Sequence, residues 1–195
     1  MSVSRTGTPD EGFSFRSDRL ALDFAATLMF RGSEHPRELL DSPGRLAAWA
    51  LASGVVSAAA PCEAEVLREA TRLRESIYRT AVARTAGHLA GPGDIQVLNH
   101  YGTTAPVTVA LDPGGMITRS GTMHAVLATI ARDAIELLGG PGSTRLRQCG
   151  RSGCTRMFID ASRGQNRTWC GMRECGNRVN AAAYRRRQRQ KLNAT

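Results

Sequence analysis

The chain has 195 residues and a mass of 21.0 kDa, which leaves room for one domain, or one domain with a small module, and excludes a large multidomain enzyme. Its composition, with 42% hydrophobic, 22% charged and 5% aromatic residues, is that of a globular protein with a buried core and excludes wholesale disorder. The net charge is +9, no run of about 18 apolar residues is present, and no apolar segment follows a basic start, so we expect a cytoplasmic protein without membrane partners.

Four amphipathic helices and one β-hairpin are predicted before the C-terminal segment. Apolar residues recurring at three- and four-residue spacing indicate the helices, over residues 18–31, 42–53, 62–86 and 122–138. Two short apolar and β-branched runs, 107–111 and 116–118, flank an Asp-Pro-Gly-Gly turn and predict the hairpin. The glycine-rich run 139–143 then ends the last helix. We therefore expect a mainly helical α+β fold with a boundary near residues 140–145.

The charges are divided unevenly across this boundary. Residues 1–144, the predicted N-terminal domain, hold 13 arginines against 15 acidic residues, a net charge of −2. Residues 145–195, the predicted C-terminal module, hold 12 arginines and Lys191 against Asp160 and Glu174, a net charge of +11. Such segregation favours a polyanion as partner of the module, nucleic acid first. A solvated charge run in an arginine-rich protein is the alternative, but it does not explain the segregation.

Four of the five cysteines form two equally spaced pairs, Cys149-x4-Cys154-x15-Cys170-x4-Cys175. Glycines beside each pair ease the turns that bring two sulfurs together. In a reducing cytoplasm such pairs are metal ligands more often than disulfides, and four thiolates in a tetrahedron are the usual structural shell of Zn²⁺. We predict one structural zinc, with two disulfides or an iron–sulfur cluster as alternatives. The fifth cysteine, Cys62, is predicted to be a partly buried residue without a ligand role.

The predicted zinc shell has two further consequences. A closed four-thiolate shell leaves no position for a water molecule, and all four histidines lie outside the module, so we expect no catalytic residues and no enzyme activity. Four thiolates and one Zn²⁺ carry a charge of −2. We expect the arginines interleaved with the ligands to neutralise it: Arg151, Arg156 and Arg173.

A basic helix is predicted from about Asn177 to Leu192, where no proline occurs and helix-forming residues dominate. Three alanines keep it slim enough for a major groove about 12 Å wide, and three arginines recur on one stripe of a 3.6-residue period. We predict that five residues contact nucleic acid, Asn180 by reading an adenine edge: Arg178, Asn180, Arg185, Arg186 and Arg189. A frayed basic tail is the alternative.

With these residues in view, the module resembles the CGNR-type zinc finger, named for the run Cys175-Gly176-Asn177-Arg178. The resemblance also includes the run Phe158-Ile159-Asp160-Ala161-Ser162-Arg163, then Arg167, Trp169, Met172 and Tyr184-Arg185. Upstream, residues 21–28 and 46–50 are similar to the N-terminal domain usually joined to this finger. The resemblance therefore extends over essentially the whole chain. It implies a stress-induced transcriptional regulator with a ligand-sensing N-terminal domain and a DNA-binding finger.

A ligand site in the N-terminal domain is predicted at three polar residues, Asp23, Thr27 and Arg31. Their four-residue spacing places them on one face of the helix expected over residues 18–31. A solvated or capping face is the alternative. The resemblance leads us to expect asparagine where this chain has Ala26, so any ligand contact made by that amide is absent here.

Together these features predict a zinc-dependent transcriptional regulator. Its closing helix is expected to bind double-stranded DNA, and its N-terminal domain a small-molecule effector. An RNA-binding module is the first alternative, although the finger offers few aromatic residues for base stacking: Phe158, Trp169 and Tyr184. A zinc-held module that binds an acidic protein is the second.

Overall fold

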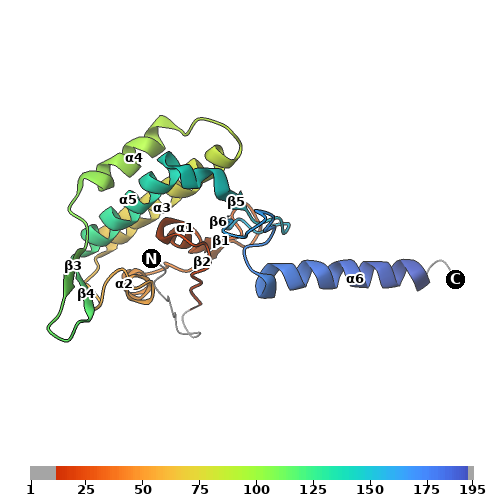
Figure 1. The fold of residues 1–195 in the computed structure, drawn as a ribbon, viewed down its shortest axis with the longest axis horizontal. Coiled ribbons are helices and arrows are strands. Elements are labelled where there is room, and N and C mark those ends of the chain that lie inside the picture. The colour runs from red at the N-terminus through yellow and green to blue at the C-terminus, as the bar shows by residue number, and fades with distance from the viewer. Residues whose placement is uncertain (1–11, 193–195) are drawn as a thin grey trace.

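The structure, a computed structural model, describes residues 12–192. Figure 1 shows a helical body formed by the N-terminal part of the chain and a small unit packed against it. A single helix, α6 (Asn177–Leu192), points away from both. We call residues 12–140 the body and residues 145–192 the finger. Long helices and few short strands confirm the predicted mainly helical α+β class.

In the described chain, five helices form the body: α1 (Leu20–Ala25), α2 (Pro43–Ala52), α3 (Ala64–Thr85), α4 (Pro92–Thr103) and α5 (Met123–Gly139). Helices α3 and α5 pack against each other, and α1 and α4 each contact both of them. Side-chain caps start two of the helices. The Ser42 hydroxyl accepts a hydrogen bond at the start of α2, and the Thr122 hydroxyl does so at the start of α5.

The core of the body lies where the apolar stripes of these helices meet. The predicted stripes of α3 and α5 are both buried, with Leu73, Ile77, Leu127 and Ile130 fully inaccessible to solvent. The Trp49 ring of α2 is 1% exposed and packs beside Phe24 of α1, with 5.0 Å between the ring centroids. Burial of such side chains contributes about 1.5 to 3 kcal/mol each, which makes this core the main source of stability.

The helix expected over residues 18–31 is wrong in length, because α1 ends at Ala25. The Thr27 N–H and hydroxyl both donate to the carbonyl oxygen of Phe24, at 3.1 and 2.7 Å, and turn the chain out of the helix. The chain then forms β1 (Leu28–Met29), which pairs antiparallel with β2 (Arg37–Glu38). Residues after α1 stay against the core, so apolar periodicity alone did not mark the end of the helix.

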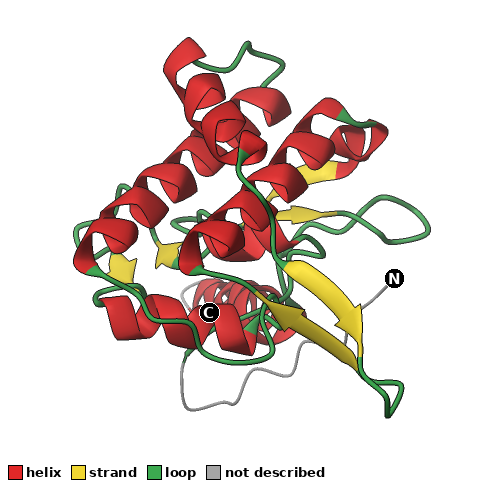
Figure 2. Ribbon diagram, turned by 90° about the vertical axis from the view of Figure 1, so that its left-hand side faces the viewer, coloured by secondary structure: helices red, strands yellow, loops and turns green. Residues whose placement is uncertain are grey.

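The described residues contain three antiparallel two-stranded sheets. Besides β1–β2, β3 (Thr108–Leu111) pairs with β4 (Ile117–Ser120), and β5 (Leu146–Gln148) pairs with β6 (Met157–Ile159). The β3–β4 hairpin, which projects from the helical body in Figure 2, is the predicted one. Its turn closes when the Gly115 N–H donates to the Asp112 carbonyl oxygen at 2.9 Å, with Gly115 at a φ of +80°. Glycine adopts this conformation without strain.

The finger is joined to the body by an apolar cluster that both units share. The short 3₁₀ helix η2 (Pro141–Arg145) leads into the finger, and Leu146 and Met157 then bury against α1, α3 and α5. Their partners in the body are Leu22, Ala81 and Leu137. The first β-hairpin of the finger therefore rests on the body, while the cysteines lie beyond it.

Hydrogen bonds reinforce this junction. The Ile159 N–H donates to the Ser17 carbonyl oxygen at 3.0 Å. This hydrogen bond holds the segment before α1 alongside β6. The Arg167 guanidinium lies 2.9 Å from the Asp18 carboxylate and 3.0 Å from the Arg16 carbonyl oxygen. The predicted division after residue 144 thus separates two segments that share an interface. Whether they fold independently stays a prediction.

Helix α6 makes little contact with the rest of the chain. From residue 177 to 190 its residues are exposed, except Val179 and Ala183, which are half-buried. Figure 1 shows it extending away from the packed helices of the body, and Figure 2 shows it end-on. None of the helices in the described residues is both long enough and apolar enough to span a membrane.

Candidate functional site

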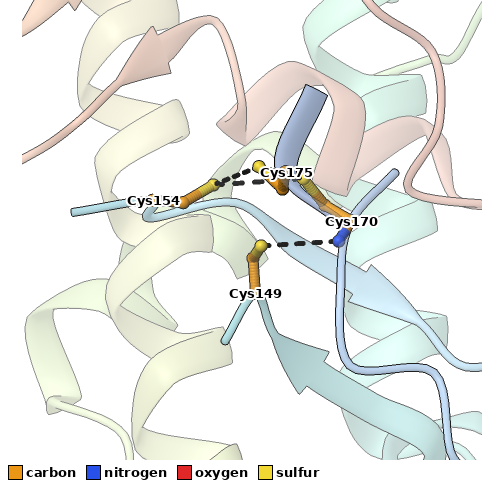
Figure 3. Close-up of side chains that lie close together, drawn as sticks. All are labelled: Cys149, Cys154, Cys170 and Cys175. Carbon is orange, nitrogen blue, oxygen red and sulfur yellow. Dashed lines mark hydrogen bonds between the residues drawn. The ribbon is translucent and has the colours of Figure 1, made fainter. Parts of the chain in front are cut away.

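The four predicted metal ligands come together from separate turns of the finger (Figure 3). Cys149 directly follows β5, and Cys154 lies in the turn between β5 and β6. Cys170 ends the long loop after β6, and Cys175 lies in η3 (Met172–Gly176), a single turn of π-helix. Gly153, beside Cys154, has a φ of +76°, which lets the turn expose the cysteine sulfurs on one side.

The spacing of the sulfurs matches one tetrahedral ion. All four Sγ atoms lie within 4.8 Å of one another. Cys170 and Cys175 are 3.5 Å apart, Cys154 and Cys170 3.9 Å, and Cys154 and Cys175 3.8 Å. A tetrahedron with metal–sulfur bonds of about 2.3 Å has edges of about 3.8 Å. These separations are far above a disulfide bond of about 2.05 Å, and a cage for several iron atoms would have to be wider. The four cysteines form a metal-binding cluster.

Hydrogen bonds favour negative charge at this cluster. The Cys170 N–H lies 3.4 Å from Cys149 Sγ, and Arg151 Nη1 lies 3.7 Å from Cys175 Sγ. Hydrogen bonds from the Cys154 and Cys170 thiols lower the pKa of Cys149, while the bond to Cys149 raises the pKa of Cys154 to about 11. Cys149 therefore ionises before Cys154, and a metal ion must displace the proton from the Cys154 thiol.

Asp160 and Arg167 connect the segments of the finger that carry the two cysteine pairs. The buried Asp160 carboxylate accepts hydrogen bonds from the Ser162 hydroxyl at 2.6 Å and from the Arg167 N–H at 2.9 Å. The Arg167 guanidinium donates to the Cys170 carbonyl oxygen at 2.7 Å and stacks on the Phe158 ring, 4.4 Å from its centroid. The family resemblance pointed to these residues, but their spacing alone did not indicate this supporting role.

The arginines interleaved with the ligands have different tasks. Arg151 lies against the Cys175 sulfur, as expected of a counter-ion. Arg156 instead donates to the Ser14 carbonyl oxygen at 2.9 Å and lies 3.9 Å from the buried Asp23 carboxylate. Arg173 is exposed. The expectation of three counter-ions is therefore supported by a direct contact for Arg151, whereas Arg156 joins the finger to the body.

The predicted nucleic-acid contacts all lie on α6. The helix begins at Asn177, two residues after the ligand Cys175, and the Cys175 and Gly176 N–H groups both donate to the Gly171 carbonyl oxygen at 3.1 Å. The metal cluster therefore fixes where the helix starts. Within residues 12–190 no ion pair holds any of the five predicted contacts, and all five are exposed: Arg178, Asn180, Arg185, Arg186 and Arg189.

The three residues predicted to bind a ligand are engaged inside the body. Asp23 is buried, and its Oδ1 accepts a hydrogen bond from the Ser17 N–H at 2.9 Å. The buried Thr27 hydroxyl donates to the carbonyl oxygen of Phe24, and Arg31 turns its guanidinium towards α3. Because α1 ends early, the three do not share one helix face. Their role as ligand contacts stays a prediction.

An ion network that sequence patterns did not indicate surrounds Arg31. Its Nε lies 3.0 Å from Glu75 Oε2, while Arg74 Nε lies 2.8 Å from Glu75 Oε1 and its Nη atoms lie 2.6 and 2.7 Å from the Glu38 carboxylate. Burial raises the pKa of both carboxyls, but the arginine hydrogen bonds and charges outweigh it and hold the pKa of Glu38 and Glu75 below the usual range. The network ties β2 to α3.

Two family models match successive parts of the chain. The ABATE family model, described as "Putative stress-induced transcription regulator", matches residues 18–141. A second family model, described as "CGNR zinc finger", matches residues 145–188 and includes all four cysteines and most of α6. No curated protein matches the chain.

Proposed function

Because the chain belongs to the ABATE family and ends in a CGNR zinc finger, we propose that it is a zinc-dependent transcriptional regulator that binds duplex DNA through α6. The regulator acts by binding and not by catalysis, with its body sensing a small-molecule effector. Its place of action is the cytoplasm, where it meets the nucleoid.

The observation that carries this proposal is a basic helix that projects from the finger with its cationic side chains in solvent. Its 16 residues span about 24 Å at 1.5 Å per residue, enough to lie along a stretch of major groove. Residues 178–190 include no acidic residue and five exposed arginines: Arg178, Arg185, Arg186, Arg187 and Arg189. Such a surface suits the regularly spaced phosphates of a duplex.

The arginines of α6 divide between two sides of the helix. Arg178, Arg185 and Arg189 fall within about 40° of one another at 100° per residue. Asn180 is about 200° from Arg178 and shares its side of the helix with Arg187. With α6 in the major groove, Arg178, Arg185 and Arg189 would face the phosphates of one DNA strand. Asn180 and Arg187 would face the opposite side of the groove. Base reading by Asn180 therefore needs the helix to enter the groove tilted.

Zinc is the ion that this cluster fits best. Cys149, Cys154, Cys170 and Cys175 would hold it, and their spacing matches one tetrahedral ion bound to four thiolates. When bound, the ion supplies structural cross-links and no open coordination position. The chain itself does the rest: Arg151 offsets the negative charge, and η3 transmits the fixed position of Cys175 to the first turn of α6.

Competition between nucleic acids tests this proposal. The purified, metal-loaded protein is titrated with a labelled random duplex and with single- and double-stranded RNA of the same length, at one salt concentration. Tighter binding to duplex DNA, followed by discrete protected sites on genomic fragments, supports a regulator. Preference for either RNA moves the RNA-binding alternative ahead. If none of these nucleic acids binds, the result favours the alternative in which the basic helix binds an acidic protein.

A further inference from the structure

A cavity of about 330 Å³ lies where the body meets the finger. Its walls come from the chain before α1, from β1 and the residue after it, from β2, and from the finger. The finger part includes three of the four metal ligands, Cys154, Cys170 and Cys175, so the cavity borders the metal cluster directly. Small-molecule sites usually measure about 300 to 1,000 Å³ and lie at such junctions between units. None of the three residues predicted as ligand contacts lines this cavity.

The lining combines an apolar surface with a few charged groups. The apolar part is contributed mainly by Phe13, Leu28, Met29 and Phe30. The charged part consists of four arginines and one carboxylate: Arg16, Arg37, Arg151, Arg156 and Glu174. An apolar wall with few convergent charges is typical of sites for organic ions.

Two of the four arginines are already committed to the protein. Arg156 is 10% exposed and is held by the Ser14 carbonyl oxygen and by Asp23. Arg151 lies against the Cys175 sulfur, so its charge is offset by the metal cluster. Neither is free to neutralise a ligand.

The other two arginines have donors to spare. Arg37 is exposed, and its side chain forms no hydrogen bond or ion pair with another residue of the described chain. Its Nη2 would lie 3.3 Å from a Cβ built on Gly12, which places the guanidinium beside the segment that carries Phe13. Arg16 forms one ion pair, with Glu174, and both side chains are nearly half exposed, at 44% and 46%. A ligand anion would compete with that pair.

We propose that this cavity binds a small organic anion, with its charged group at Arg16 and Arg37 and its apolar body against Phe13, Met29 and Phe30. The anion pairs with the Arg16 guanidinium and breaks its ion pair with Glu174. Glu174 lies in η3, between two metal ligands and three residues before α6. Occupancy of the cavity therefore releases a tether between the body and the base of the basic helix. The effect on DNA rests on the proposed function, whereas the binding site does not.

Binding of matched probes tests the site itself. Calorimetry on the zinc-loaded protein compares naphthalene-2-carboxylate, benzoate and decanoate with their neutral amides, without DNA. We expect at least one carboxylate to bind, at least tenfold more tightly than its amide. Arg37→Gln should weaken that carboxylate about tenfold and leave the amide unchanged, because it removes one charge-assisted hydrogen bond. Arg163→Gln, which removes an exposed arginine of the finger away from the cavity, should change neither.

Three results would overturn the proposed site: no carboxylate binds, the amides bind equally well, or Arg37→Gln leaves carboxylate affinity unchanged. Zinc content and the thermal unfolding midpoint of each variant show that its fold is intact. These outcomes do not depend on whether the protein binds DNA.

Glu174→Gln tests the coupling. Losing an ion pair of this exposure is expected to change an equilibrium about two- to fivefold. The variant should bind the carboxylate more tightly by that factor and duplex DNA more weakly, while the carboxylate should weaken DNA binding by the wild type and not by the variant. Unchanged carboxylate affinity in the variant overturns the tether. If the wild type binds the carboxylate but no DNA, the proposed function fails and the anion site stands.

Discussion

Removing the metal should unfold the cysteine-bearing part of the finger and spare the body. The separate apolar cluster of the finger contains one fully buried aromatic side chain, Phe158, besides three of the cysteines. Its burial contributes about 1.5 to 3 kcal/mol. Ordering the backbone costs about 1 to 2 kcal/mol per residue. A structural zinc supplies roughly 10 to 16 kcal/mol in finger peptides, so the turns that carry the ligands cannot stay ordered without it.

The structure also predicts a gradient within the finger. Leu146 and Met157 bury against the body, so β5 and β6 should lose less protection than the loops that carry Cys170 and Cys175. Helix α6 should fray, because a helix of 16 residues without tertiary contacts is marginal in water.

Hydrogen exchange with and without a chelator measures this pattern. We expect the amides of Gly150 and Cys175, which bond to Thr168 and Gly171, to exchange freely after chelation. Amides within α3 and α5 should keep their protection. Cys154→Ser should reproduce the effect of the chelator, and Cys62→Ser, outside the cluster, should not. Retained protection around Cys175, or equal loss throughout the body, would refute the reasoning.

Three further predictions follow from single features. Elemental analysis of protein purified under reducing conditions should find one zinc per chain, and iron or a stoichiometry near zero would contradict the proposed ion. Asp160→Asn removes the charge that orders Ser162 and Arg167, so zinc affinity should fall about 10- to 100-fold in a competition with a chromogenic chelator, and unchanged affinity would show that the carboxylate plays no supporting role. The pKa values of Glu38 and Glu75 are lower in the folded protein than in the unfolded chain. The stabilisation by these two carboxylates is therefore present above about pH 4.5 and is lost as pH falls through the folded pKa values. Urea unfolding should show that Glu75→Gln lowers the free energy of unfolding more at pH 7 than at pH 3.5.

Sequence patterns predicted the elements whose formation is local. The Cys-x4-Cys pairs predict the metal cluster because one local turn brings the two cysteines of each pair together. Helix α6 is predicted by a run of sixteen residues without proline. The stripes of α3 and α5 are long enough for their period to be unambiguous. The β3–β4 hairpin is predicted by the Asp-Pro-Gly-Gly turn between its two strands.

Elements fixed by contacts distant in the chain were missed. Helix α4 begins at Pro92, in a run that reads as a turn, because proline costs nothing in the first turn of a helix. The partners Arg74 and Glu38 are 36 residues apart, and no spacing rule pairs them. The cavity likewise needs the finger to dock on β1, which depends on the shared cluster of Leu22, Leu137 and Met157.

The salt dependence of DNA binding tests the central claim most directly. If Arg178, Arg185, Arg186 and Arg189 each neutralise one phosphate, log affinity should fall against log salt with a slope of about −3.6, or about 150-fold from roughly 50 to 200 mM. The triple variant Arg185→Gln, Arg186→Gln, Arg189→Gln keeps the cysteines and should reduce the slope to about −1. A control with the same net charge replaces three exposed arginines outside α6, Arg145, Arg163 and Arg173, by glutamine and should keep most of the slope. Equal slopes in the triple variant and the wild type, with zinc retained, would contradict DNA binding by α6.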